Sequence, residues 1–121
     1  TAAIKYLIAL GMENVIAHEC SLMEYALKRL KKCTKIKVYG PEGTKLRCGI
    51  IPFNVEGLNS HDVALLLDSY GIMIRSGFHC AQPLHQKLGI PSSARASFYI
   101  YNTREEIDRF VEALKEIEQA L

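Results

Sequence analysis

The chain has 121 residues, of which 49% are hydrophobic and 23% are charged, and its formal net charge is +2 at pH 7. This length and composition predict one globular domain over residues 1–121, and the small net charge argues against nucleic acid as the main partner. No apolar stretch approaches the ~20 residues of a membrane-spanning helix, and none has the pattern of a secretory signal, so we expect no membrane partner.

The first half of the chain predicts two helices and a β-hairpin. A helical pattern over residues 2–10 stops at Gly11, and it starts at Thr1 without a methionine, so we expect the chain to be a piece of a longer polypeptide. Further elements follow in chain order: a helix over 13–32, a strand over 35–39, a turn over 40–43 and a second strand over 48–53. Pro52 predicts that this second strand is an edge strand or carries a bulge.

The second half alternates helices with short strands. Asn59 or Ser60 can cap a helix over 61–70, and Thr103 with Glu106 forms a capping box. The remaining elements are a strand over 72–75, a short helix over 84–88 closed by Gly89, a strand over 96–101 and a final helix from 103. This order predicts an α+β fold, with a small, mostly antiparallel sheet and helices packed on one face.

The four cysteines are widely spaced and form no C-x-x-C pair, which predicts free thiols and a cytoplasmic location. Three of them are expected to be small buried hydrophobic residues: Cys20, Cys33 and Cys48. Three histidines are expected on helix surfaces: His18, His61 and His85. Cys80, His79 and His85 could contribute to a zinc site, but no second ligand cluster accompanies them, so we expect no metal.

The segment Arg75-Ser-Gly-Phe-His-Cys-Ala-Gln-Pro83 has the composition of a functional loop. Its glycine allows a bend and its proline restricts the backbone, so Cys80 is expected to be exposed near positive charge, although a buried inert thiol is the alternative. Arg75 lies at the end of one predicted strand and Arg95 at the start of another. If the strands are neighbours, the two arginines could face one pocket and orient a carboxylate. Alternatively, each makes a surface ion pair. His79 either relays protons or packs in the loop.

These residues resemble a known family. The segments 75–83, Ser93-Ala-Arg-Ala-Ser-Phe and Tyr101-Asn-Thr-Arg-Glu-Glu-Ile-Asp108 are similar to the C-terminal small domain of Suf-type (group II) cysteine desulfurases. These are class-V aminotransferase-like enzymes of fold-type I, which use pyridoxal phosphate. The resemblance covers essentially the whole chain. Phe78 departs from it, because many members have a second histidine there, and this changes the packing of the loop.

The resemblance implies that Cys80 is the nucleophile, which takes sulfur from L-cysteine as a persulfide and leaves L-alanine. It implies that Arg95 binds the substrate carboxylate, that Arg75 lies beside substrate and loop, and that His79 supports the loop. The cofactor, pyridoxal 5′-phosphate, needs a Schiff-base lysine, and no lysine of this chain lies in a matching motif. We therefore expect the cofactor to be bound by a large domain outside this chain, without which the chain is inactive.

The resemblance further implies a sulfur-acceptor protein of the Suf type, a role in iron–sulfur cluster assembly and a homodimeric full-length enzyme. Two alternatives stay open at this stage. One is a selenocysteine lyase or a related pyridoxal-phosphate lyase with the same fold. The other is a stand-alone module that carries sulfur on Cys80, or binds a metal, without the cofactor.

Overall fold

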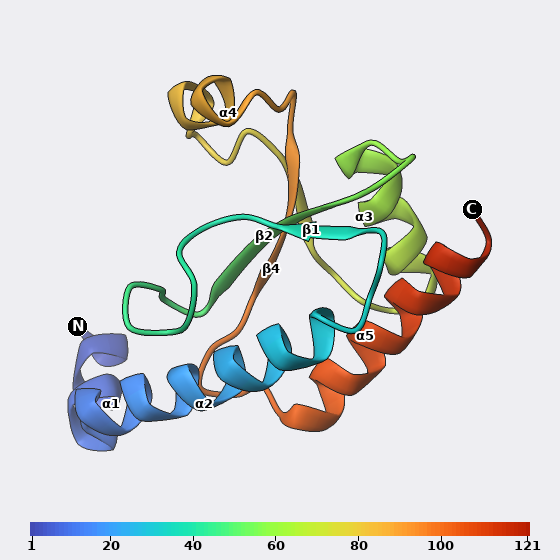
Figure 1. Ribbon diagram of the computed structural model, residues 1–121. Coiled ribbons are helices and arrows are strands. Elements are labelled where there is room, and N and C mark those ends of the chain that lie inside the picture. The colour runs from blue at the N-terminus through green and yellow to red at the C-terminus, as the bar shows by residue number, and fades with distance from the viewer.

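In the computed structural model, which describes residues 1–121, the chain forms five helices and four strands (Figure 1). The helices are α1 (Ala2–Leu10), α2 (Met12–Leu30), α3 (Ser60–Ser69), α4 (Gln82–Leu88) and α5 (Arg104–Gln119). The strands are β1 (Ile36–Val38), β2 (Ile50–Val55), β3 (Arg75–Gly77) and β4 (Ser93–Ser97).

The strands form one antiparallel sheet in the order β1-β2-β4-β3, with α2, α3 and α5 packed on one face. Alternate residues of a strand point to opposite faces of the sheet, so every second residue of β2 and β4 faces the core. These core residues are Ile51, Phe53, Val55, Ala94 and Ala96. The predicted α+β architecture is therefore confirmed, and Ser93, Arg95 and Ser97 belong to the opposite face of β4.

Capping signals located the helix starts well. The Asn59 side chain accepts hydrogen bonds from the backbone N–H groups of His61 and Asp62, and Thr103 forms the predicted reciprocal box with Glu106. Each cap satisfies amide donors that have no partner within the helix. The starts of α3 and α5 thus follow from local sequence.

Three predictions about the strands are wrong. The strand expected over 72–75 is β3 over Arg75–Gly77, so the two overlap only at Arg75. Pro52 lies in β2, an interior strand of the sheet. Its carbonyl accepts from the Tyr39 N–H just beyond the end of β1. The proline cannot return the reciprocal bond, and the Tyr39 carbonyl accepts instead from Arg47 Nη2 at 2.9 Å. The strand expected over 96–101 is β4 over 93–97, because Ala94 and Ala96 fill the sheet side of the core and Tyr99 then turns, its N–H donating to Asn102.

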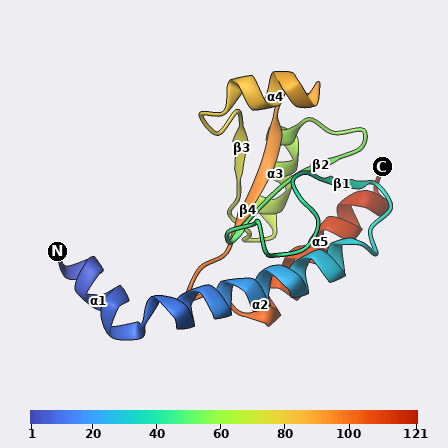
Figure 2. The ribbon, with the colours of Figure 1, turned by 60° about the vertical axis from the view of Figure 1, so that its left-hand side comes forward.

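The helices α4 and α1 lie apart from this core. Figures 1 and 2 show α4 at the end of the sheet opposite α2 and α5, directly after the loop that carries Cys80. Figure 2 shows α1 extending away from the sheet, and none of its residues is buried. No helix in this structure combines the length and apolar character that crossing a membrane requires.

The cysteine predictions are correct only in part. Cys33 is buried against the core, where burial raises the pKa of its thiol. Cys20 is half-buried on α2, and Cys48 is exposed, contrary to expectation. Cys48 lies in an irregular segment before β2, so it does not occupy a core-facing position of the strand.

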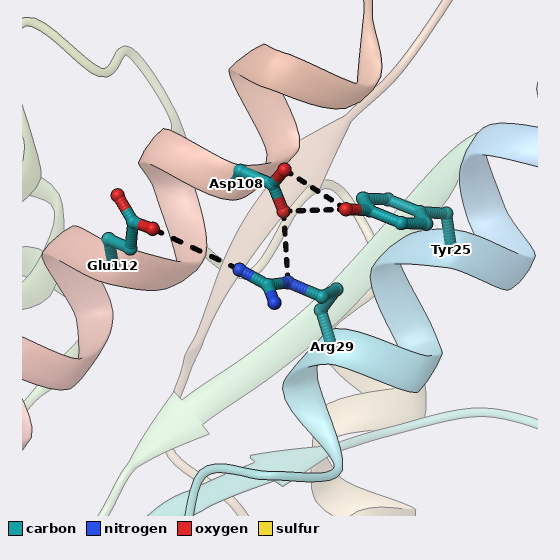
Figure 3. Close-up of polar contacts among 4 residues, drawn as sticks. All are labelled: Tyr25, Arg29, Asp108 and Glu112. Atoms are coloured by element: carbon teal, nitrogen blue, oxygen red, sulfur yellow. Dashed lines mark hydrogen bonds and ion pairs between the residues drawn. The ribbon is translucent and has the colours of Figure 1, made fainter.

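A polar cluster joins α2 to α5 (Figure 3). The Tyr25 hydroxyl donates to both carboxylate oxygens of Asp108, at 2.8 and 3.0 Å, and Arg29 Nε lies 2.9 Å from Asp108 Oδ1. We expect Asp108→Ala to lower the free energy of unfolding by about 1–2 kcal/mol, measured by urea denaturation, because two donors lose a charged acceptor. Glu112→Ala is the control and should change it by less than ~0.5 kcal/mol, because Arg29 and Glu112 are 4.0 Å apart and the Glu112 side chain is 66% exposed.

Candidate active site

Cys80 lies exposed at the centre of a tight turn between β3 and α4. The Ala81 N–H donates to the Phe78 carbonyl at 2.8 Å, and the two central residues both have positive φ, +53° at His79 and +58° at Cys80. Turns of this handedness usually carry Asn-Gly. Two side chains in left-handed conformation cost about 1–2 kcal/mol each, and such strain is concentrated at functional sites.

The strain at Cys80 leads to a prediction about stability. We expect Cys80→Gly to be more stable than Cys80→Ala by about 0.5–1 kcal/mol, because glycine adopts positive φ without a steric clash. Urea denaturation of the two variants measures this difference. At Cys48, where φ is not positive, we expect the reverse order, with alanine above glycine. The same order at both positions would contradict the strained turn.

His79 is anchored to β4. Its Nε2–H donates to the Ser93 carbonyl at 2.9 Å. Burial lowers the pKa of His79 below its ordinary value, and the nearby charges of Arg95 and Arg75 lower it further, against the opposing effect of the Ser93 bond. The neutral imidazole is thus the form at pH 7. Because the unfolded chain binds this proton more readily, the contribution of His79 to stability is complete above about pH 6.5 and decreases as the pH falls below it.

The two arginines of the motif meet across two strands. Arg75 of β3 and Arg95 of β4 are directly paired in the antiparallel register, so their side chains share the sheet face opposite the helices. Neither forms an ion pair within the chain, which excludes the alternative of two intrachain surface pairs. Arg95 Nε is enclosed and has no hydrogen-bond partner. Like charges at paired positions repel, so this arrangement favours an anion between the guanidinium groups.

Of the three histidines expected on helix surfaces, one prediction is wrong. His18 and His61 are exposed, but His85 is only 4% exposed and lies under the Cys80 turn. Its Nε2 lies 3.0 Å from the Ser93 hydroxyl, which is also buried. The sequence did not predict the burial of these two residues or the contact between them. The helix α4 is too short to give a periodic signal, and β4 begins at Ser93, three residues before the predicted strand.

The side chains at this site do not fit the pyridoxal cofactor. They are a thiol, two guanidinium groups and two imidazoles, and no lysine takes part in their contacts, whereas the cofactor needs a lysine amine. The chain also gathers no group of three or more His, Cys, Asp or Glu side chains that could hold a metal ion. What the site offers is an exposed thiol in the turn after β3 and two paired guanidinium groups on β3 and β4.

The class of protein follows from a match to a known family. The chain matches the family described as Aminotransferase class-V over residues 1–110. It therefore belongs to the class-V aminotransferase family.

The most similar relatives include cysteine desulfurases. The chain is 51% identical over 113 residues to a cysteine desulfurase from Haloferax volcanii. These residues cover 93% of this chain and 26% of the relative. A probable cysteine desulfurase from Halobacterium salinarum is 49% identical over 97% of the chain and 28% of the relative. The chain thus spans little more than a quarter of the length of these relatives.

Solved structures show the same fold. The apo structure of a cysteine desulfurase from Thermococcus onnurineus NA1 superimposes with a TM-score of 0.95 at 39% identity, over 99% of this chain and 30% of that one. The cysteine desulfurase CsdA from Escherichia coli gives a TM-score of 0.85 at 31% identity, over 99% of this chain and 29% of that one.

Proposed function

We propose that this chain is the C-terminal small domain of a cysteine desulfurase, in which Cys80 accepts the sulfur of L-cysteine. One observation carries the proposal. An exposed thiol in a strained turn follows β3 directly, and β3 and β4 carry two paired guanidinium groups that have no acidic partner within the chain. A nucleophile for sulfur and a clamp for a carboxylate are the two groups that this reaction needs from the protein, beside the cofactor.

The residues divide the work as follows. Arg95, which is half-buried and whose Nε is enclosed, binds the substrate carboxylate through its guanidinium group, and the exposed Arg75 adds positive charge. The thiolate of Cys80 attacks the substrate sulfur, so that an S–S bond forms while the C–S bond breaks and its electron pair goes to the carbon. The products are alanine, after that carbon takes up a proton, and a persulfide on Cys80. His79 supports the loop through Ser93.

The cofactor of this proposal is pyridoxal 5′-phosphate, which acts as an electron sink for the substrate when bound. Because the residues of this chain do not fit it, it would be held by the large domain of the longer enzyme. The share of the relatives' length that this chain spans supports that division. The isolated chain would then be inactive, while the full-length enzyme would be a cytoplasmic homodimer of the Suf type that passes sulfur to an acceptor protein for iron–sulfur cluster assembly.

Product analysis of the full-length enzyme tests the proposal. With L-cysteine and no acceptor, we expect one alanine for each sulfur retained, and peptide mass spectrometry should find the added sulfur on the peptide with Cys80 and not on that with Cys48. Turnover of selenocysteine but not cysteine would instead indicate a selenocysteine lyase. Sulfur bound to Cys80 in the isolated chain, without alanine formation, would indicate a stand-alone carrier.

A further inference from the structure

We propose that His85 is a positioning residue that fastens the Cys80 turn to β4, a role that rests on the proposed function of Cys80. His85 is the buried residue beneath the turn, and it is not part of the main hydrophobic core. Its ring meets the Phe78 ring edge to face at 5.7 Å between centroids, and the His79 ring at 6.0 Å. It therefore contacts the turn on the side of α4.

The Ala81 carbonyl fixes the direction of one hydrogen bond of His85, and the direction of the other follows in the neutral ring. Its Nδ1 lies 3.0 Å from the Ala81 carbonyl, which can only accept, so Nδ1 carries the proton. In the neutral ring Nε2 is then an acceptor, and the Ser93 hydroxyl donates to it at 3.0 Å. His85 thus links Ala81, the residue after Cys80, to Ser93.

Ser93 receives a second link from the other side of the thiol. Its carbonyl accepts the Nε2–H of His79, the residue before Cys80, at 2.9 Å. Ser93 is 1% exposed and is paired with Gly77 across β3 and β4, so it does not move independently of the sheet. Both neighbours of Cys80 are consequently fastened to one rigid residue, directly through His79 and indirectly through His85.

These links explain how the turn keeps two unfavourable conformations. Without them, His79 and Cys80 would relax from positive φ towards the extended backbone that their side chains prefer. Removing His85 would also leave the buried Ser93 hydroxyl without its acceptor. The thiol would then sample many positions, and a displacement of about 1 Å from the reacting atom can lower a rate by roughly 100-fold.

Three cysteines of this chain make the test internally controlled. Cys80 is the thiol under test, exposed Cys48 is the reference, and buried Cys33 reports unfolding. Iodoacetamide labels the chain for increasing times, and peptide mass spectrometry gives the labelling rate of each cysteine. The measured quantity is the ratio of the Cys80 rate to the Cys48 rate, compared with the same ratio in denaturant.

We expect the native ratio to differ at least threefold from the ratio in denaturant, and His85→Leu to move it most of the way to the denatured value while Cys33 stays unlabelled. Gln86→Leu, the same change at an exposed neighbour on α4, should leave it unchanged. His85→Gln, whose amide oxygen can accept from Ser93, should restore part of the native ratio. Ser93→Ala combined with His85→Leu should change the labelling ratio no more than His85→Leu alone, because both changes break the same hydrogen bond between His85 and Ser93.

Other results overturn the proposal. A native ratio equal to the denatured one, or a native ratio retained in His85→Leu, would show that His85 does not position the thiol. Labelling of Cys33 in His85→Leu, or additive effects of the two changes, would make His85 a general packing residue. The labelling does not involve cysteine turnover, so it distinguishes failure of this role from failure of the proposed function. In the desulfurase assay, His85→Leu should lower kcat roughly 100-fold and leave KM for L-cysteine unchanged.

Discussion

Replacing Cys80 by alanine is expected to abolish sulfur transfer in the full-length enzyme, with a fall in turnover of roughly 1000-fold or more. The reason is that alanine has no thiol to attack the substrate sulfur, and no other cysteine lies in the turn between β3 and α4. Alanine release and transfer of the outer persulfide sulfur to an acceptor thiol measure the loss. The absorbance of the bound cofactor should not change, because Cys80 does not hold it.

Cys48→Ala is the matched control, since Cys48 is also exposed but lies before β2, away from the arginine pair. It should retain full turnover. If Cys80→Ala kept its rate, or if Cys48→Ala lost it, the assignment of the nucleophile would be wrong. Denaturation profiles of both variants separate a chemical loss from an unfolded domain.

Local signals in the sequence located the helices but not the start of β4. The caps at Asn59 and Thr103 act within a few residues, so they can be recognised without any tertiary information. The strand β4 uses Ala94 and Ala96, which have low strand propensity, and they are selected because small side chains fit between the sheet and its helices. Only the packed structure supplies that preference.

The sequence predicted the exposed thiol and the neighbouring arginines of the candidate site, but not the buried contact beneath the turn. The exposure of Cys80 and the neighbourhood of Arg75 and Arg95 followed from the loop and from adjacent strands, and the register places the arginines opposite each other. The burial of His85 depends on Ser93, eight residues later and on a different element. A contact of that kind leaves no periodic or motif signal, so the sequence offered no means to find it.

Replacing Arg95 by alanine is expected to lower kcat/KM for L-cysteine roughly 100- to 1000-fold, the effect of removing one partner of an enclosed charge pair. Arg95 Nε is enclosed without an internal partner, so the carboxylate of the substrate is its proposed acceptor. Arg95→Lys should recover only part of the loss, because an ammonium group cannot form the two parallel hydrogen bonds of a guanidinium group. Steady-state kinetics of the full-length enzyme measure these changes.

The matched comparison uses Arg75 and a substrate without a carboxylate. Arg75 is exposed, so Arg75→Ala should cost less than about tenfold. Cysteamine carries the amine and thiol of cysteine but no carboxylate, so the wild-type enzyme and Arg95→Ala should bind it equally well. An equal loss of affinity for cysteamine and for L-cysteine in Arg95→Ala would mean that Arg95 shapes the site and does not bind the carboxylate. A loss confined to L-cysteine would assign the clamp to this residue, since the two ligands differ only in the group that it is proposed to hold.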